Sequence, residues 1–239
     1  MPLNIRKAKT ALKEGVGHAK ILIWGNSGSG KSWLSATAPK PLICLTEKNG
    51  MVSIANSNQN ADFVFIENVA ELRELIAMAK SGELKKYQTL CFDSLTELQK
   101  MIRDGILNGR SSDQMKIQDW GKLAQRTIGF IREIRDLPFH IVCTALKSDS
   151  INEEGAVISV GPAFEGRKTG NEVMQYFSAV AALHSQKKED KTVRSLYFSG
   201  PQRMMVKPCH PIDGQIENPN LTEIINSIIN NKAITKKGE

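Results

Sequence analysis

The stretch that decides the fold is Gly25-Asn26-Ser27-Gly28-Ser29-Gly30-Lys31-Ser32, followed by Trp33. It matches the phosphate-binding loop pattern Gly-x-x-x-x-Gly-Lys-Ser/Thr at every fixed position. Small residues let the backbone N–H groups point inward and form a nest for an anion, and the helix that follows adds its positive dipole end. We expect Lys31 to reach the β- and γ-phosphates and the Ser32 hydroxyl to bind Mg²⁺. Residues 25–33 are the predicted nucleotide-binding residues.

The sequence around this loop supplies the setting that the pattern needs. Residues 18–24 have the apolar character of a short buried strand, and residues 31–38 are expected to form the helix that leaves the loop. Pro39 and Pro41 would end that helix. Strand, glycine-rich turn and helix in this order favour a nucleotide site over the alternative, a flexible Gly/Ser turn.

Length and composition limit the number of domains and the cellular location that we expect for the protein. The 239 residues, 41% of them hydrophobic, suit one α/β domain with or without a small appendage. No apolar run approaches the roughly 20 residues that span a bilayer, and residues 1–7 lack the apolar core of a signal peptide. We therefore expect a cytoplasmic protein with no membrane partner.

Cysteines and charge narrow the range of partners. No two of the four cysteines have Cys-x-x-Cys spacing, which favours buried thiols over a zinc or redox site. The net charge of +7 favours a polyanionic partner such as nucleic acid. Much of the excess lies near the two ends of the chain, where basic residues are also typical of solvated tails.

Strand-like and helix-like segments alternate along the chain, which predicts a mostly parallel sheet with helices on its faces. Strands are expected at 41–46, 61–66, 87–92 and 139–145, and helices at 69–80, 95–107 and about 114–136. The polar segment 148–160 contains a turn signal and is either a β-hairpin or a mobile loop. The remaining elements are a helix at 171–177, a strand pair at 179–184 and 193–198, and a helix at 221–230.

Three polar residues that end predicted strands complete a candidate catalytic site. Asp93 ends an apolar strand and is the expected carboxylate partner of Mg²⁺, with helix capping as the alternative role. Glu47 ends the strand at 41–46 and is the candidate that orients the attacking water, with Glu97 as the weaker alternative. Thr144 ends the strand at 139–145 and is a candidate sensor of the γ-phosphate.

The order of these pieces resembles the RecA-like ATPase core. Within that group the chain looks most like the short phage-encoded RecA-like proteins, the nucleotide-binding AAA-type ATPases of the Sak type that are linked to single-strand annealing and recombination. The resemblance covers roughly residues 18–207. It implies an ATPase that uses ATP and Mg²⁺ and binds single-stranded DNA in phage recombination, in the cytoplasm of a bacterial host. A single-strand-binding protein is a candidate further partner.

The resemblance also implies roles for individual residues. Arg167 and Lys168 lie where the family has its DNA-binding loop. RecA-like subunits bind ATP between neighbours, which implies head-to-tail self-association into a ring or filament. Arg203 and Lys207 follow the antiparallel strands and are candidates for basic residues that act on the site of the next subunit.

The resemblance divides the chain into a short basic segment (1–17), an ATPase core (18–207) and a C-terminal tail with a short helix (208–239). The strand at 139–145 ends in Thr144, where full-length RecA proteins place a glutamine. Phe164 is the one aromatic residue of the expected DNA loop, which limits base stacking there. ATP-dependent binding of single strands is therefore a firmer expectation than strand exchange.

Two other functions compete with a DNA-dependent ATPase. A small-molecule kinase would close an arginine-rich lid over the phosphates, and the segment 108–110 is too poor in arginine to form one. The other is a nucleotide-switched assembly protein, such as a helicase-loading or packaging accessory, that acts through a protein partner.

Overall fold

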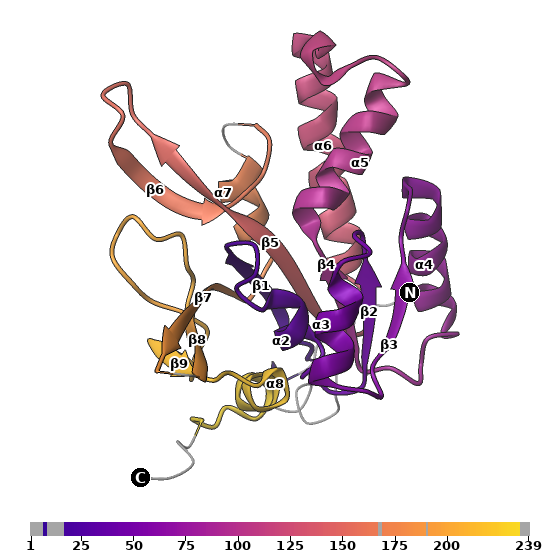
Figure 1. Cartoon of the computed structure of the whole chain (residues 1–239). Coiled ribbons are helices and arrows are strands. Elements are labelled where there is room, and N and C mark those ends of the chain that lie inside the picture. Colours follow the sequence, from indigo (N-terminus) through magenta and orange to yellow (C-terminus); the bar gives the residue numbers. More distant parts are fainter. Residues whose placement is uncertain (1–6, 9–16, 167–168, 190, 235–239) are drawn as a thin grey trace.

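The computed structural model describes residues 7–8, 17–166, 169–189 and 191–234. Within these residues one sheet of nine strands runs through the molecule (Figure 1). Its order is β3 (Asp62–Phe65), β2 (Pro41–Leu45), β4 (Thr89–Asp93), β5 (His140–Ile151), β1 (Lys20–Gly25), β7 (Ala179–Lys188), β8 (Lys191–Tyr197) and β9 (Gln215–Glu217). The ninth strand, β6 (Val157–Pro162), pairs with β5.

The sheet is parallel from β3 to β7 and antiparallel beyond. This arrangement confirms the predicted α/β class with an antiparallel strand pair toward the C-terminus. β5 lies between β1, which leads into the phosphate-binding loop, and β4, which ends in Asp93. All these strands run the same way, so their carboxyl ends meet at one edge of the sheet.

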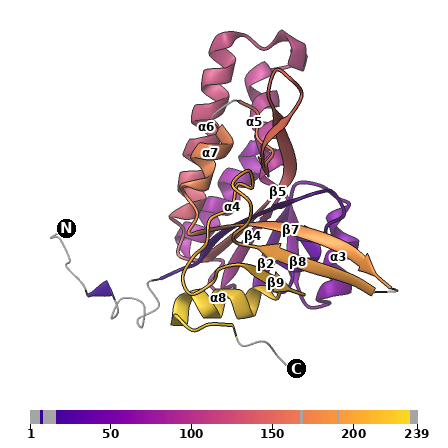
Figure 2. The same ribbon diagram turned by 90° about the vertical axis from the view of Figure 1, so that its left-hand side faces the viewer.

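Helices cover both faces of the sheet (Figure 2). One face carries α4 (Val69–Ser81), α5 (Leu95–Leu107), α6 (Ile117–Arg135) and α7 (Thr169–Met174). The other carries α2 (Lys31–Ser35), α3 (Gly50–Ser57) and α8 (Leu221–Asn230). A 3₁₀ turn, η1 (Ser112–Gln114), joins α5 to α6.

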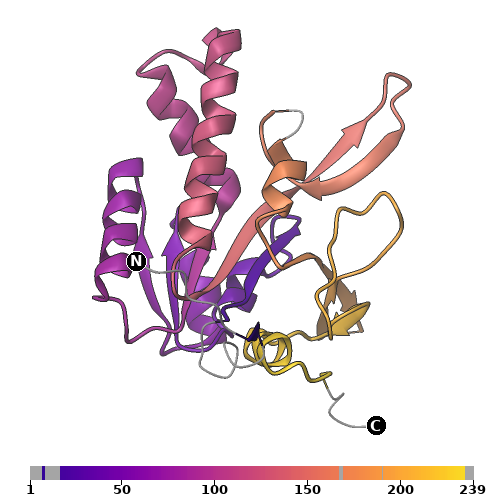
Figure 3. The same cartoon turned by 180° about the vertical axis from the view of Figure 1, so that it is seen from behind.

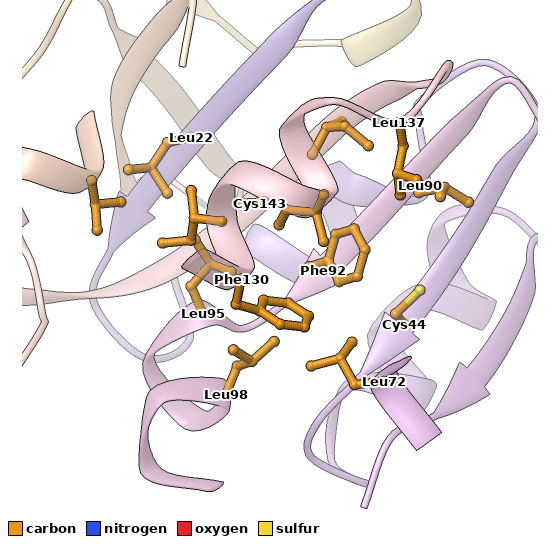
Figure 4. Packing of buried hydrophobic residues seen from close by; sticks show 14 of the residues in the cluster. Leu22, Cys44, Leu72, Leu90, Phe92, Leu95, Leu98, Phe130, Leu137 and Cys143 are labelled. Carbon is orange, nitrogen blue, oxygen red and sulfur yellow. The ribbon is translucent and has the colours of Figure 1, made fainter. Parts of the chain in front are cut away.

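Two hydrophobic cores follow from the alternation of side chains along each strand. In β4, Leu90 and Phe92 point to the first core, under α5 and α6, whereas Cys91 points to the second core, under α2 and α8. Figure 4 shows Phe92 packed among Leu95, Phe130 and neighbouring side chains of the first core. Cys44, Cys91 and Cys143 are all buried, as their apolar surroundings in the sequence predict.

Local sequence signals set the ends of several helices. The Asn68 side chain accepts hydrogen bonds from Ala70 N and Glu71 N at the start of α4, and Gly82 ends that helix in a left-handed conformation. Ser94 caps α5 through a bond from Glu97 N. Asp93 therefore remains the last residue of β4 and is not the helix cap.

The hairpin alternative for the segment after β5 is confirmed. β5 does not stop near residue 145 but continues to Ile151 and pairs with β6 from Lys147 to Ile151. The hairpin and the α5–α6 pair project from the same edge of the sheet (Figures 1 and 3). Helix α3 and strand β9 were not predicted, and α2 ends at Ser35, earlier than expected.

The described part of the segment after residue 208 is packed against the sheet. β9 pairs with β8, and Leu221, Ile224 and Ile225 of α8 are buried in the second core. The start of α8 is tied to the turn after α2, where Leu221 N donates to Thr37 Oγ1 at 2.9 Å.

None of the helices in the described part of the chain is both long and apolar enough to cross a membrane.

Truncation of a buried α8 side chain tests whether this helix is an integral part of the domain. We expect Ile224→Ala to lower the free energy of unfolding by about 2–5 kcal/mol, because it leaves a cavity in the second core. Denaturant unfolding of the purified protein measures the change. The matched control is Asn226→Ala on the exposed face of α8, which should stay within about 0.5 kcal/mol of the wild type. Equal stability of both variants would show that α8 is only loosely attached.

Candidate active site

The phosphate-binding loop connects the end of β1 to the start of α2. Gly28 and Gly30 have φ angles of 75° and 95°, a region that favours glycine. Gly25 is required for a different reason, because a Cβ at this position would collide with the carbonyl oxygen of Leu183 on β7. The neighbouring strand thus fixes where the loop begins.

Lys31 is buried, and its ammonium group folds back over the loop. Its Nζ donates to the carbonyl oxygens of Gly25 at 3.0 Å and Asn26 at 2.8 Å. Burial lowers the pKa of Lys31, while the negative charges of Asp93 and Glu47 act in the opposite direction. The lysine therefore lies within the field of both predicted catalytic carboxylates.

A pocket of about 490 Å³ opens in front of the loop at the carboxyl edge of the sheet. Its lining includes Lys31, Ser32, Trp33, Glu47 and Asp93, which the sequence predicted as site residues. The volume falls in the range of small-molecule and cofactor sites. Residues far apart in the sequence are thus brought together as expected.

Ser32 and Asp93, the predicted Mg²⁺ ligands, lie on either side of Gly50. A Cβ built on Gly50, at the start of α3, would lie 2.9 Å from Leu45 Cδ2, 3.5 Å from Ser32 Oγ and 3.7 Å from Asp93 Oδ2. The two oxygens therefore face a common space that a side chain at position 50 would fill. The described residues contain no cluster of three acidic, histidine or cysteine ligands. Two oxygen donors fit Mg²⁺, which keeps several waters and takes phosphate oxygens as its other ligands.

Glu47 has the electrostatic surroundings of a proton acceptor. Partial burial raises its pKa, and the nearby carboxylates of Glu97 and Asp93 raise it further, against the opposing effect of Lys100 and Lys31. A carboxylate with a raised pKa is a better base for a water molecule near neutral pH. Glu97, the alternative candidate, is ion-paired with Lys100 and does not line the pocket.

A family profile described as an AAA domain matches residues 18–208, most of the chain. The chain belongs to the AAA domain family. A comparison with curated protein sequences found no significant match. The parallel strands β4, β5 and β1, with the phosphate-binding loop directly after β1, give this AAA domain the α/β fold that the P-loop pattern predicts.

Solved structures similar to this AAA domain include two archaeal proteins. The flagellar accessory protein FlaH from Methanocaldococcus jannaschii has a TM-score of 0.41 and 12% identity, over 81% of this chain and 84% of FlaH. The KaiC-like protein PH0186 from Pyrococcus horikoshii has a TM-score of 0.42 and 14% identity, over 85% of this chain and 92% of that protein.

Thr144 lies behind Asp93 and not in the pocket lining of the AAA domain. It is fully buried on β5, and its Oγ1 donates a hydrogen bond to Asp93 Oδ1. This bond occupies one carboxylate oxygen, while Oδ2 faces the space beside Ser32. The structure therefore gives Thr144 contact with the carboxylate that is predicted to hold Mg²⁺, and direct sensing of the γ-phosphate stays a prediction.

The predicted trans-acting residues lie away from the pocket of their own chain. Arg203 Nη1 donates to Val157 O at 3.3 Å, and Lys207 Nζ donates to Phe177 O at 2.8 Å. Neither residue lines the pocket, and their action on a neighbouring subunit stays a prediction. Arg167 and Lys168, the predicted DNA-binding residues, lie outside the described residues.

Two groups stand out among the pocket residues that sequence reasoning missed. The first is Asn49 together with α3, which contributes Gly50, Ser53 and Asn56. The second is Arg194 of β8. The polar spacing of residues 49–56 gave a weak signal for a helix facing the pocket. No local signal marks Arg194, because only the pairing of β7 with β8 and the fold of the sheet bring it to the loop.

Filling the space beside Gly50 tests the Mg²⁺ site. We expect Gly50→Ala to weaken Mg²⁺-dependent nucleotide binding by roughly tenfold, in keeping with the about 1–3 kcal/mol cost of overfilling a packed site. Titration calorimetry with ADP, with and without Mg²⁺, separates this effect from general damage, because binding without Mg²⁺ should change little. The control is Gly105→Ala on α5, where an added Cβ meets no atom within 4 Å. Equal loss of affinity with and without Mg²⁺ would contradict the placement.

Proposed function

We propose that this chain binds ATP with Mg²⁺ and hydrolyses it to ADP and phosphate. The observation that carries the proposal is the convergence of Lys31, Asp93 and Glu47 on one pocket from the loop, β4 and the end of β2. Lys31 supplies positive charge for the phosphates, and Asp93 with Ser32 would hold Mg²⁺, which neutralises phosphate charge when bound. Glu47 would be the base that accepts a proton from the attacking water.

The chemical step needs a water molecule activated next to the γ-phosphate. Glu47 accepts a proton as the water oxygen bonds to the γ-phosphorus and the bond to the β–γ bridging oxygen breaks. Lys31 exchanges its bonds to the Gly25 and Asn26 carbonyls for bonds to phosphate oxygens. Thr144 keeps Asp93 in orientation throughout through its hydrogen bond to Oδ1.

Removal of the Glu47 charge tests its role as the base. We expect Glu47→Gln to lower the rate of ATP hydrolysis by roughly 100- to 10,000-fold, because the amide cannot accept the proton of water. ATP affinity should remain within a few-fold of the wild type. Steady-state phosphate release and calorimetric binding measure the two quantities.

The pH dependence of the wild type tests the same role. As the pH is lowered, the hydrolysis rate should begin to fall at a pH above the ordinary pKa range of glutamate, because the pKa of Glu47 is raised and the protonated carboxyl cannot act as a base.

Two control variants complete this test. Lys31→Ala should lose nucleotide affinity as well as hydrolysis, because Lys31 is the cation of the loop. Glu97→Gln should retain most of the activity if Glu47 is the base. Undiminished hydrolysis by Glu47→Gln would rule out its role, and loss of activity in Glu97→Gln alone would transfer that role to Glu97.

We further propose that hydrolysis is coupled to single-stranded DNA and serves phage homologous recombination or strand annealing, in a head-to-tail ring or filament. The RecA-like order of the site and the net charge of +7 support this proposal. So does the path of the chain, since residues just before Arg167 and Lys168 are hydrogen-bonded to α5. Thr96 Oγ1 donates to Ala163 O, and Glu165 N donates to Gln99 Oε1 at 2.7 Å. Helix α5 itself begins two residues after Asp93.

Single strands should stimulate hydrolysis if this coupling exists. We expect the rate with single-stranded DNA to exceed the rate without it, and the double variant Arg167→Gln and Lys168→Gln to lose most of the stimulation. The salt slope of DNA binding should fall by about 0.7 for each lost phosphate contact. The double variant Lys187→Gln and Lys188→Gln removes equal charge at the exposed end of β7 and serves as control. Absence of stimulation in the wild type would favour the alternative, an assembly protein switched by nucleotide.

A further inference from the structure

Arg194 is the one basic residue of the pocket lining, within the described chain, that the loop motif does not supply. It lies on β8, opposite Ser185 of β7. Its backbone is held on the other side by Asn218, whose N–H donates to Arg194 O at 2.7 Å. The antiparallel strands thus fix the main chain from which this long side chain reaches the phosphate-binding loop.

The side chain of Arg194 packs on the loop and on α2. A Cβ built on Gly30 would collide with Arg194 Nε and lie 3.0 Å from its Cδ. The guanidinium carbon is 4.6 Å from the centre of the Trp33 ring, a cation–π distance. Gly30 therefore has a second reason to be glycine, besides its positive φ angle. Trp33 forms the surface on which the guanidinium rests.

The charge of Arg194 has no protein counterpart in the described structure. Its Nε is buried without a hydrogen-bond partner, and no carboxylate of the described residues forms an ion pair with it. A guanidinium with an unused buried donor is unfavourable unless an anion supplies the acceptor. In contrast, the charge of Lys31 in the phosphate-binding loop is stabilised by the negative charges of Asp93 and Glu47. The unpaired cation and the anion nest face the same pocket.

We propose that Arg194 is a nucleotide-binding residue that contacts the non-transferred phosphates, α or β, in the pocket of its own subunit. This inference rests on the proposed ATP site and adds to it. Arg194 packs on Gly30 and Trp33, whereas Ser32 Oγ and Asp93 Oδ2 face Gly50. We therefore assign Arg194 to the phosphates that lie along the loop and not to the γ-phosphate. A contact of this kind stabilises substrate and transition state equally, so it affects binding and not the chemical step.

Arg194→Met tests the contact while keeping an apolar stem on Trp33. We expect the dissociation constants of both ATP and ADP to rise by roughly 10- to 100-fold, as for loss of a hydrogen bond to a charged group. KM should rise in proportion, and kcat should stay within a few-fold of the wild type. Arg194→Lys should recover part of the affinity. Lys191→Met, which removes an exposed charge from the same strand outside the pocket, should bind like the wild type.

The results separate this inference from the proposed function. Wild-type affinity of Arg194→Met for both nucleotides would overturn the inference and leave only a packing role on Trp33, while the proposed hydrolysis by Glu47 would stand. A loss for ATP alone, or a fall in kcat, would also overturn it and place Arg194 at the γ-phosphate. Failure of the wild type to bind either nucleotide would overturn both. Thermal unfolding without nucleotide checks the fold, and if Arg194→Met is unfolded, the same comparison is made with Arg194→Lys against Lys191→Met.

Discussion

The position of β5 between β1 and β4 is the constraint on which the rest of the site depends. Its parallel pairing with both strands sets the register of the loop that follows Gly25 relative to Asp93. β1, β4 and the first half of β5 are buried on both faces, so a shift of one residue would exchange the side chains of the two cores. The cores thus hold the loop and the carboxylate in one relative position.

The same strand connects the nucleotide site to the outer hairpin. Thr144, in the buried half of β5, donates a hydrogen bond to Asp93, and Leu146 lines the pocket. From Lys147 onward β5 leaves the sheet and pairs with β6. The chain then returns to α5 through the bonds of Thr96 and Gln99. A change at Asp93 therefore has a short, hydrogen-bonded route to the segment that precedes Arg167 and Lys168.

Charge is distributed unevenly across the pocket. Glu47, Asp93 and Lys31 act on one another at one end, where the pKa of Glu47 is raised and that of Lys31 is lowered, each chiefly by burial. Arg194 lies over Gly30 and Trp33 with no acidic partner in the described chain. This division suits a substrate that carries several phosphates and reacts at only one end. Chemistry and binding would then depend on different residues, and each could be altered separately.

The sequence by itself determined the loop, the α/β alternation and the strand-end positions of Glu47 and Asp93, because these depend on local spacing and on apolar runs. It also gave the hairpin at 148–160 as one of two alternatives. The tertiary structure decided three further features. Thr144 bonds to Asp93 because β5 and β4 are neighbours, α8 is part of the second core, and Arg194 reaches the phosphate-binding loop. Each of these features depends on contacts between residues about 50 or more positions apart. Such contacts arise from strand order and core packing, and neither leaves a local pattern in the amino-acid sequence.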